Sequence, residues 1–229
     1  MKLFVIEGLD GSGKSTQIKL LGDYLKKSGF KYEYLHFPRT EAPWFGELIA
    51  RFLRGEFGSL DKVDPYLVAM LYAGDRRDAA ALIRKWFDEG NVVLLDRYTY
   101  SNIAYQCAKY EDSKRQDELK EWILRLEFEH FMIPRPSVNI FLDVPVSFIE
   151  GRLMSEREGD DRKYLNGKPD IHESNINFQI RVRNMYLRVA ATDPSLEVIN
   201  CADKNGNILA PGKVFGLVLE KLNRKRLLE

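Results

Sequence analysis

Near its start, the chain changes within a few residues from an apolar run to a glycine-rich segment and then to a helical pattern. The segment from Gly8 to Ser15 fits the pattern G-x-x-x-x-G-K-[ST] and stands between a strand candidate and a helix candidate, as that pattern requires. Glycines let the backbone curl so that its N–H groups converge on phosphate oxygens at a helix N-terminus. The residues expected to hold a nucleoside triphosphate are Gly8, Leu9, Asp10, Gly11, Ser12, Gly13, Lys14, Ser15 and Thr16.

Two side chains of this loop carry chemistry of their own. Lys14 supplies a cation for the β and γ phosphates, and we predict that it is catalytic. The hydroxyl of Ser15 is a candidate ligand for Mg²⁺. The alternative, a glycine turn that merely joins a strand to a helix, leaves the lysine and the serine unexplained.

Short apolar runs recur along the chain and alternate with helical patterns. The strand candidates are Leu3–Ile6, Tyr32–Phe37, Val92–Leu95, Val138–Leu142 and Glu197–Asn200. Since these runs are apolar throughout, we expect strands buried on both faces, as in a parallel sheet. One helix is expected from Lys14 to Lys27, and another from Pro65 to Gly90. The pattern predicts an α/β fold: a doubly wound, parallel five-stranded sheet flanked by helices, of the P-loop type.

Length and charge limit the classes of protein that the chain can represent. Its 229 residues suit one domain, residues 1–229, with a substantial core. A net charge of +1 gives no global field for nucleic acid or an acidic membrane, and no apolar run has membrane-spanning length. The two cysteines, Cys107 and Cys201, match no zinc or redox spacing. We therefore expect a cytoplasmic protein that binds neither nucleic acid nor membrane.

The third strand candidate ends in Asp96-Arg97, at the edge of the sheet where ligands bind in doubly wound folds. Asp96 is a second candidate for holding Mg²⁺, and Arg97 brings a fixed cation that suggests a second anion. A surface ion pair between them is the alternative. The sequence has no N-K-x-D tetrapeptide, which argues against a GTPase switch.

Further arginines and flat rings stand near the other strand ends. Arg39 closes the second strand candidate, and Tyr72 and Arg76 lie four residues apart on one helical face. A ring and a guanidinium on one face suit a nucleobase, by stacking and by hydrogen bonding. Taken alone, a core tyrosine beside a solvated arginine is the more common arrangement on such a helix.

Four motifs in this order, EGLDGSGKSTQ, FPRT, LYAGDR and DRYTYSNIAYQ, resemble the thymidylate kinase family of P-loop nucleoside monophosphate kinases. The string DRY-x-x-S-N-x-A-Y-Q is the family-specific part, because many NTPases share the P-loop. The resemblance implies transfer of the γ-phosphate of ATP to dTMP, with Mg²⁺ as cofactor, for dTTP synthesis. It also implies a homodimer formed by helix packing, for which helices near 65–87 and 119–131 are candidates, and an adenine site formed by backbone near 200–208.

The resemblance assigns roles to individual residues of this sequence. Asp10 would accept a hydrogen bond from the 3′-hydroxyl, Arg97 and Arg39 would clamp the monophosphate, and Arg97 would be catalytic. The ring of Tyr105 would crowd the 2′ position and so exclude ribonucleotides. The residues implied at the base are Tyr72 by stacking, Arg76 on O4, Ser101, Asn102 and His172.

The charged segment at about 155–174 reads as a solvated surface loop on composition alone, and as a mobile lid once the resemblance is considered. One branch of the family carries an arginine in the P-loop beside the aspartate, where this chain has Gly11. The resemblance therefore implies a transition-state arginine from the lid, with Arg152, Arg157 and Arg162 as candidates and Arg157 favoured.

Two positions depart from the family pattern. His172 stands where a tyrosine is usual, and a titrating ring there would make dTMP binding depend on pH. In Phe37-Pro38-Arg39 a residue that family members often insert before the arginine is missing, so Arg39 either approaches the phosphate from a shifted position or falls short of it.

Two other functions compete with this hypothesis. A deoxynucleoside kinase, or another nucleoside monophosphate kinase, shares the P-loop and the Asp-Arg strand end. A deoxynucleoside kinase needs a carboxylate base for its hydroxyl acceptor, whereas Arg39 fits an acceptor that already carries a phosphate. The second competitor is a nucleotide sensor without turnover, against which the intact Lys14 and Ser15 argue.

Overall fold

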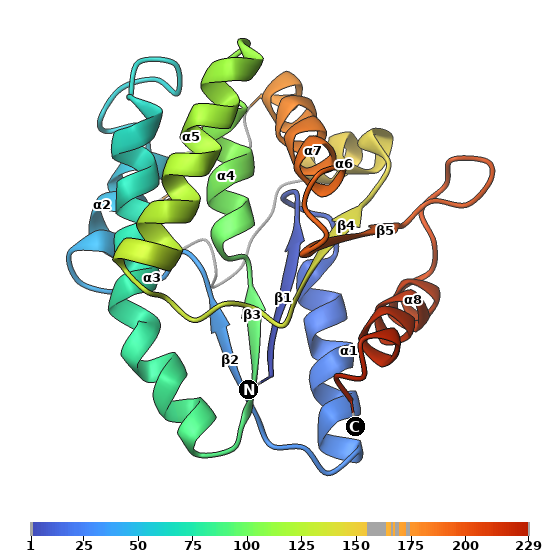
Figure 1. Ribbon diagram of the computed structural model, residues 1–229. Helices are drawn as coiled ribbons and strands as arrows, with labels where there is room; N and C mark the ends of the chain where they lie inside the picture. The colour runs from blue at the N-terminus through green and yellow to red at the C-terminus, as the bar shows by residue number, and fades with distance from the viewer. Residues whose placement is uncertain (1, 155–163, 166, 168–169, 173–174, 229) are drawn as a thin grey trace.

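The computed structural model describes residues 2–154, 164–165, 167, 170–172 and 175–228 (Figure 1). The strands are β1 (Leu3–Gly8), β2 (Tyr32–His36), β3 (Val92–Asp96), β4 (Val138–Asp143) and β5 (Leu196–Asn200). The helices are α1 (Lys14–Lys27), α2 (Phe45–Leu53), α3 (Pro65–Asp88), α4 (Thr99–Cys107), α5 (Ser113–Arg125), a turn of π-helix η1 (Leu126–His130), α6 (Val146–Met154), α7 (Ile176–Ala190) and α8 (Pro211–Arg224).

The strands form one parallel sheet in the order β2-β3-β1-β4-β5. Strand β1 lies between β3 and β4; after β1 the chain runs out to the edge strand β2, returns through β3 and then crosses β1 to β4, so the winding reverses beside β1. The register aligns Ile6 with Asp96 and Gly8 with Leu142, and therefore brings the carboxyl ends of these three strands to one edge of the sheet. A ligand crevice is expected at this edge in a doubly wound fold.

Alternate residues of β1 pack into different layers. Phe4 belongs to the large apolar cluster that includes Leu21 of α1, whereas Val5 belongs to the cluster that includes Ile83 of α3. Helices α1 and α8 lie side by side next to the sheet, and α3 lies on the other side of the view (Figure 1). Among the described helices, none combines the length and the apolar character needed to span a membrane.

The predicted fold class is confirmed, and all five strand candidates form strands. The expectation that every strand is buried on both faces is wrong for the two edge strands, β2, where Tyr34 is 45% exposed, and β5, where Asn200 is exposed. Strand β2 lies at the edge of the sheet, where apolar side chains can stay exposed, so its apolar composition does not predict that it is buried. The central strands β1 and β3 are buried throughout.

Both predicted helices form with their expected signals. Helix α1 spans Lys14–Lys27, and Gly29 after it has a φ of 81°, a conformation that suits glycine. Helix α3 begins with Pro65, and the Asp64 side chain accepts a hydrogen bond from the Tyr66 N–H at 2.8 Å. The longest helix is thus fixed at the end that leads toward Tyr72.

The segment between β2 and α2 folds tightly onto the start of α2. A Cβ atom built at Gly46 would lie 2.0 Å from the backbone carbonyl oxygen of Arg39. Because the obstacle is backbone, a rotamer change cannot relieve it. Gly46 therefore permits the close approach that seats Arg39 beside α2.

We predict that Gly46→Ala lowers the free energy of unfolding by about 1–3 kcal/mol, because the added methyl group displaces backbone. The matched control is Gly216→Ala in α8, where a Cβ would meet nothing within 4 Å. It is expected to leave stability unchanged or raise it by up to about 1 kcal/mol. Urea unfolding followed by circular dichroism measures both variants, and equal stability of Gly46→Ala and wild type would refute the close approach.

Candidate active site

The loop between β1 and α1 has the backbone of a phosphate cradle. Gly11 and Gly13 adopt φ values of 78° and 87°, which side chains rarely tolerate. At Gly8 a Cβ would lie 2.5 Å from Ser12 Oγ, so a larger residue there would displace the Ser12 hydroxyl. The Ser12 hydroxyl is buried and has no hydrogen-bond partner in the described part of the chain, which leaves it available to a phosphate oxygen.

Lys14 is the buried cation of the loop. Its side chain bends back so that Nζ donates to the carbonyl oxygen of Leu9 at 2.9 Å. Burial and the nearby charge of Arg97 lower the pKa of Lys14. A phosphate would favour its charged form. Ser15 and Thr16, in the first turn of α1, are exposed and open to a ligand.

The end of β3 provides a carboxylate close to this lysine. Asp96 is 3% exposed, its Oδ2 lies 3.4 Å from Nδ1 of His36, and its Oδ1 has no hydrogen-bond partner among the residues described. Burial raises the pKa of Asp96, but the charge of Lys14 and the contact with His36 outweigh burial and hold the pKa below its usual value. Asp96 is therefore an ionised, partly uncommitted oxygen donor, which suits a hard cation such as Mg²⁺.

Arg97 joins the loop to the end of β3. Its backbone adopts a φ of 65°, unusual for a residue with a side chain. Nη2 of Arg97 donates to Asp10 Oδ1 at 2.6 Å, and the Tyr105 hydroxyl donates to Asp10 Oδ2 at 2.8 Å. The guanidinium also lies over the Tyr105 ring, 5.1 Å from its centroid. Three residues predicted for substrate binding thus form one network.

The charges of this network fix the protonation states. Burial raises the pKa of Asp10, but the charges of Arg97 and Lys14 outweigh it and hold this pKa well below its usual range. Burial lowers the pKa of Arg97, which Asp10 nevertheless raises above its ordinary value. Burial also raises the pKa of Tyr105. At neutral pH the network is an ion pair with a neutral tyrosine.

Beneath Arg97, the buried carboxylate of Glu7 holds the start of α4. It accepts from the backbone N–H groups of Tyr98 at 3.0 Å and Ser101 at 3.3 Å. It also accepts from the hydroxyls of Ser101 at 2.5 Å and Tyr186 at 2.9 Å. The Ser101 hydroxyl in turn accepts from Nη1 of Arg97 at 3.1 Å. Ser101, which was predicted to face the base, therefore binds Arg97, the arginine predicted to hold the acceptor phosphate.

A second fully buried carboxylate, Glu127 of η1, holds the residues predicted for base recognition. Nε and Nη2 of Arg76 both donate to it at 2.6 Å. It also accepts from the Thr99 hydroxyl at 2.8 Å and from Nδ2 of Asn102 at 3.0 Å. Burial lowers the pKa of Arg76, but Glu127 keeps it above its ordinary value.

Tyr72 and His172 lie in apolar surroundings. Tyr72 is half-buried against a cluster of α2 and α3 side chains, and burial raises the pKa of its hydroxyl. The His172 ring packs on those of Phe52, Tyr105 and Phe178, with centroid distances of 5.5, 5.0 and 5.5 Å.

This packing overturns the expectation that His172 titrates near neutral pH. Burial, together with the charge of Lys109, lowers the pKa of His172 to about 3. The ring is therefore neutral between pH 6 and pH 8, and its titration cannot change dTMP binding in that range. It acts as an aromatic packing group beside Tyr105.

Arg39 is bound to α3. Its Nε donates to Asp75 Oδ1 at 2.8 Å, its backbone N–H donates to Asp75 Oδ2 at 2.9 Å, and its Nη2 donates to Asp78 Oδ2 at 2.6 Å. With these carboxylates occupied, the guanidinium must release Asp75 or Asp78 before it turns to a phosphate. The two alternatives expected from the shortened FPR motif, a shifted approach to the phosphate and a failure to reach it, both stay open.

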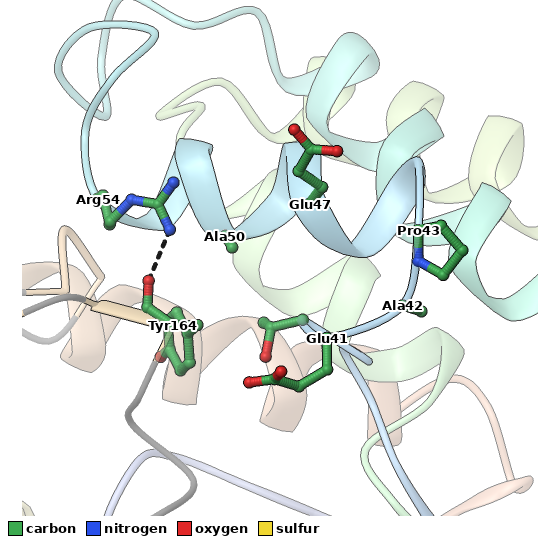
Figure 2. Close-up of a pocket in the computed structure, with 8 residues that line it drawn as sticks. Glu41, Ala42, Pro43, Glu47, Ala50, Arg54 and Tyr164 are labelled. Carbon is green, nitrogen blue, oxygen red and sulfur yellow. Dashed lines mark hydrogen bonds between the residues drawn. The ribbon is translucent and has the colours of Figure 1, made fainter.

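A pocket of about 380 Å³ opens between α2, the segment before it and Tyr164 (Figure 2). Nη1 of Arg54 donates to the carbonyl oxygen of Tyr164 at 2.6 Å across its rim. Glu41 and Glu47 line this pocket, which therefore suits a triphosphate poorly. The residues predicted to bind phosphate lie at the loop between β1 and α1 instead.

The lid candidates cannot be located in the same way. Arg157 and Arg162 lie outside the described residues. Arg152 lies in α6, where the structure describes its backbone and not its side chain. Sequence reasoning also missed the two carboxylates that organise α4, Glu7 and Glu127. The available signal was a glutamate placed directly after or within apolar residues, in LFVIEG and in LEFEHF.

Comparisons with known proteins identify the family of the chain. A family model described as thymidylate kinase matches residues 6–209. A probable thymidylate kinase of Thermococcus kodakarensis is 34% identical over 204 residues, covering 87% of this chain and 89% of the relative. A thymidylate kinase of Mycobacterium tuberculosis is 30% identical over 189 residues, covering 82% and 86%.

A solved thymidylate kinase structure from Candida albicans matches with a TM-score of 0.72 at 24% identity, covering 100% of this chain and 93% of that one, which supports the fold. The family match disfavours both alternatives, the deoxynucleoside kinase and the sensor without turnover. On its motifs, its fold and these relatives, the chain belongs to the thymidylate kinase family.

Proposed function

We propose that Lys14, Arg97 and Arg157 act in the reaction of this family, in which the γ-phosphate of ATP passes to dTMP to give dTDP and ADP for dTTP synthesis. The observation that carries the residue assignment is the 2.6 Å ion pair between Arg97 and Asp10. It joins the loop that cradles the donor phosphates to the strand end that receives the acceptor.

The acceptor needs no general base, because a dTMP phosphate oxygen is already ionised. That oxygen attacks the γ-phosphorus while the bond to the bridging oxygen of ADP breaks. Arg97 holds the acceptor phosphate, and Lys14 moves from the Leu9 carbonyl oxygen to the β and γ phosphates. Arg157 of the lid supplies a further cation, a role supported by Gly11 at the loop position where some family members carry an arginine.

The residues at the loop fit a magnesium ion. Asp96 offers an ionised carboxylate with one oxygen that has no hydrogen-bond partner among the described residues, and Ser15 offers an exposed hydroxyl in the first turn of α1. No cluster of three or more His, Cys, Asp or Glu able to hold a metal occurs within the described residues, which suits an ion that takes most of its ligands from phosphates and water. When bound, the ion would neutralise charge on the transferred phosphate.

Sugar and base selection follow from the neighbouring side chains. The Tyr105 ring, held by Asp10 and by His172, would occupy the space of a ribose 2′-hydroxyl, and Asp10 would share its oxygens with the 3′-hydroxyl. Tyr72 would stack on thymine, while Arg76 and Asn102 would read its edge. Arg39 would join the phosphate once it leaves Asp75.

We further propose a cytoplasmic homodimer. Leu67, Met70 and Leu82 of α3 are 63, 45 and 39% exposed, and apolar side chains on one helix favour packing against a second copy. Cys107 and Cys201 are both buried free thiols, which agrees with a reducing compartment. The backbone near 200–208, where Ala202 bridges to Ile208, remains the candidate adenine site.

We predict that Arg97→Met lowers kcat/KM for dTMP by about 10²–10³-fold, because the acceptor phosphate loses its fixed cation. The KM for ATP should stay within about twofold of wild type, since Lys14 and the loop are retained. A coupled ADP-release assay measures both constants. Arg224→Met, which removes an exposed arginine paired with Glu220 on α8, is the control. An unchanged kcat/KM for dTMP in Arg97→Met would show that Arg97 does not hold the acceptor phosphate.

We also predict that His172 makes stability fall in acid. Its pKa of about 3 in the fold lies below the ordinary 6.5, so the unfolded chain binds the extra proton between these values. Stability from this group is complete above pH 6.5 and declines by up to about 1.4 kcal/mol per pH unit below it. Urea unfolding at pH 7.5 and pH 5 should show a smaller acid loss for His172→Phe than for wild type. The exposed His130→Gln variant should retain the full loss, and an equal loss in all three proteins would contradict the buried neutral ring.

A further inference from the structure

Glu127 is surrounded by hydrogen-bond donors. The carboxylate is 0% exposed, and it lies in the turn of π-helix that follows α5. Oε2 accepts from Nε of Arg76 and the Thr99 hydroxyl, and Oε1 accepts from Nη2 of Arg76 and Nδ2 of Asn102. Because it is completely buried and bound by donors from α3 and α4, this carboxylate fixes the orientation of both helices' polar side chains.

The first consequence concerns the amide of Asn102. Its Nδ2 has two acceptors, Oε1 of Glu127 and the backbone carbonyl oxygen of Ala69, both at 3.0 Å. If the amide were flipped, its oxygen would face these two acceptors, so the network determines the orientation. Oδ1 is then the group left without a partner in the described part of the chain, and it is buried. Asn102 thus keeps a hydrogen-bond acceptor of fixed orientation for a ligand.

The second consequence concerns Arg76. The guanidinium has two of its three nitrogens, Nε and Nη2, bound to Glu127. Nη1 is the remaining nitrogen, and an arginine nitrogen can donate but never accept. Arg76 and Asn102 are tied to the same carboxylate, so their remaining groups form a donor and an acceptor of fixed relative position.

We propose that Glu127 is a specificity-determining positioning residue that makes the base site accept an imide edge and reject a cytosine edge. The inference rests on the placement of the base at Arg76 and Asn102 under the proposed function. Thymine offers a carbonyl oxygen at C4 beside an N–H at position 3, which matches the donor of Arg76 and the acceptor of Asn102. Cytosine offers an amino group, which would meet the donor of Arg76, and an unprotonated ring nitrogen, which would meet the acceptor of Asn102.

The inverted edge is rejected because every polar contact fails at once. Donor faces donor at the amino group, and acceptor faces acceptor at the ring nitrogen. A site whose buried polar groups are left unpaired discriminates far more strongly than one that differs by a methyl group. Rejection at both positions needs a fixed amide, because a free Asn102 amide would rotate and donate to the ring nitrogen of cytosine, leaving only the clash at the amino group.

A glutamine at position 127 would break this rigidity. A carboxylate accepts at both oxygens, whereas an amide carries one acceptor and one donor. In Glu127→Gln, the amide nitrogen must face donors of Arg76, Thr99 or Asn102. Where it faces Asn102, the asparagine amide gains a reason to flip, and the acceptor at the base site becomes a donor.

The test is the ratio of kcat/KM for dTMP to kcat/KM for dCMP. In Glu127→Gln we expect this ratio to fall by at least about tenfold, with the KM for ATP changed less than about twofold. Glu127→Asp, which keeps an acceptor-only group, should retain more of the ratio than Glu127→Gln. A folded Glu127→Gln enzyme with the wild-type ratio would overturn the inference.

Glu7→Gln is the matched control, since Glu7 is the other fully buried carboxylate that holds α4, and its hydrogen bonds go to Tyr98, Ser101 and Tyr186. It is expected to lower turnover of both nucleotides and to leave their ratio unchanged. A loss of the ratio in Glu7→Gln equal to that in Glu127→Gln would assign the effect to general disturbance of α4, against the inference.

A second measurement uses the wild-type chain, so it does not depend on a variant that folds. Nuclear magnetic resonance of the Asn102 side-chain amide should show both protons protected from solvent exchange, with and without dTMP, since each has an acceptor. Exchange at the rate of an exposed amide would overturn the fixed orientation. A wild-type enzyme that turns over neither dTMP nor dCMP would refute the proposed function as well, whereas turnover of dTMP with no preference over dCMP would refute this inference alone.

Discussion

The start of helix α4 is held by two buried carboxylates, and the rest of the site depends on that position. Glu7 reaches it from the end of β1, and Glu127 reaches it from η1. A buried carboxylate at a helix N-terminus is favourable because the backbone N–H groups there carry partial positive charge. Arg97 precedes α4, and Asn102 and Tyr105 lie within it, so the residues proposed for phosphate, base and sugar contacts are all positioned by this one helix.

Burial makes this arrangement strict. A buried carboxylate without partners is strongly disfavoured, so Glu7 and Glu127 remain only where several donors converge. The loop that holds the donor phosphates begins at the residue after Glu7, and therefore the same carboxylate ties the donor site to the acceptor site. Removing one partner costs more than the pair contributes, because a buried charge is left uncompensated.

The local signals in the sequence predicted what is local in the structure. The glycine pattern placed the loop, the apolar runs placed the strands, and Pro65 placed the start of α3. The buried networks join residues far apart in the chain, such as Arg76 with Glu127, and no spacing rule connects such positions. The pKa of His172 depends on three aromatic rings from separate elements, so its identity alone suggested the wrong protonation behaviour. Exposure of β2 likewise depends on its place at the sheet edge.

The charge balance of the site explains why a further cation has to arrive with the substrates or from the lid. Lys14 and Arg97 are offset by Asp10 and Asp96, so these four groups together bring no net positive charge. ATP and dTMP add several negative charges, and the transferred phosphate spreads charge over its oxygens in the transition state. The described groups orient both nucleotides, but their charges are already paired. The surplus that lowers the barrier must therefore come from other cations, and this need supports the proposal that an arginine of the 155–174 segment acts in catalysis.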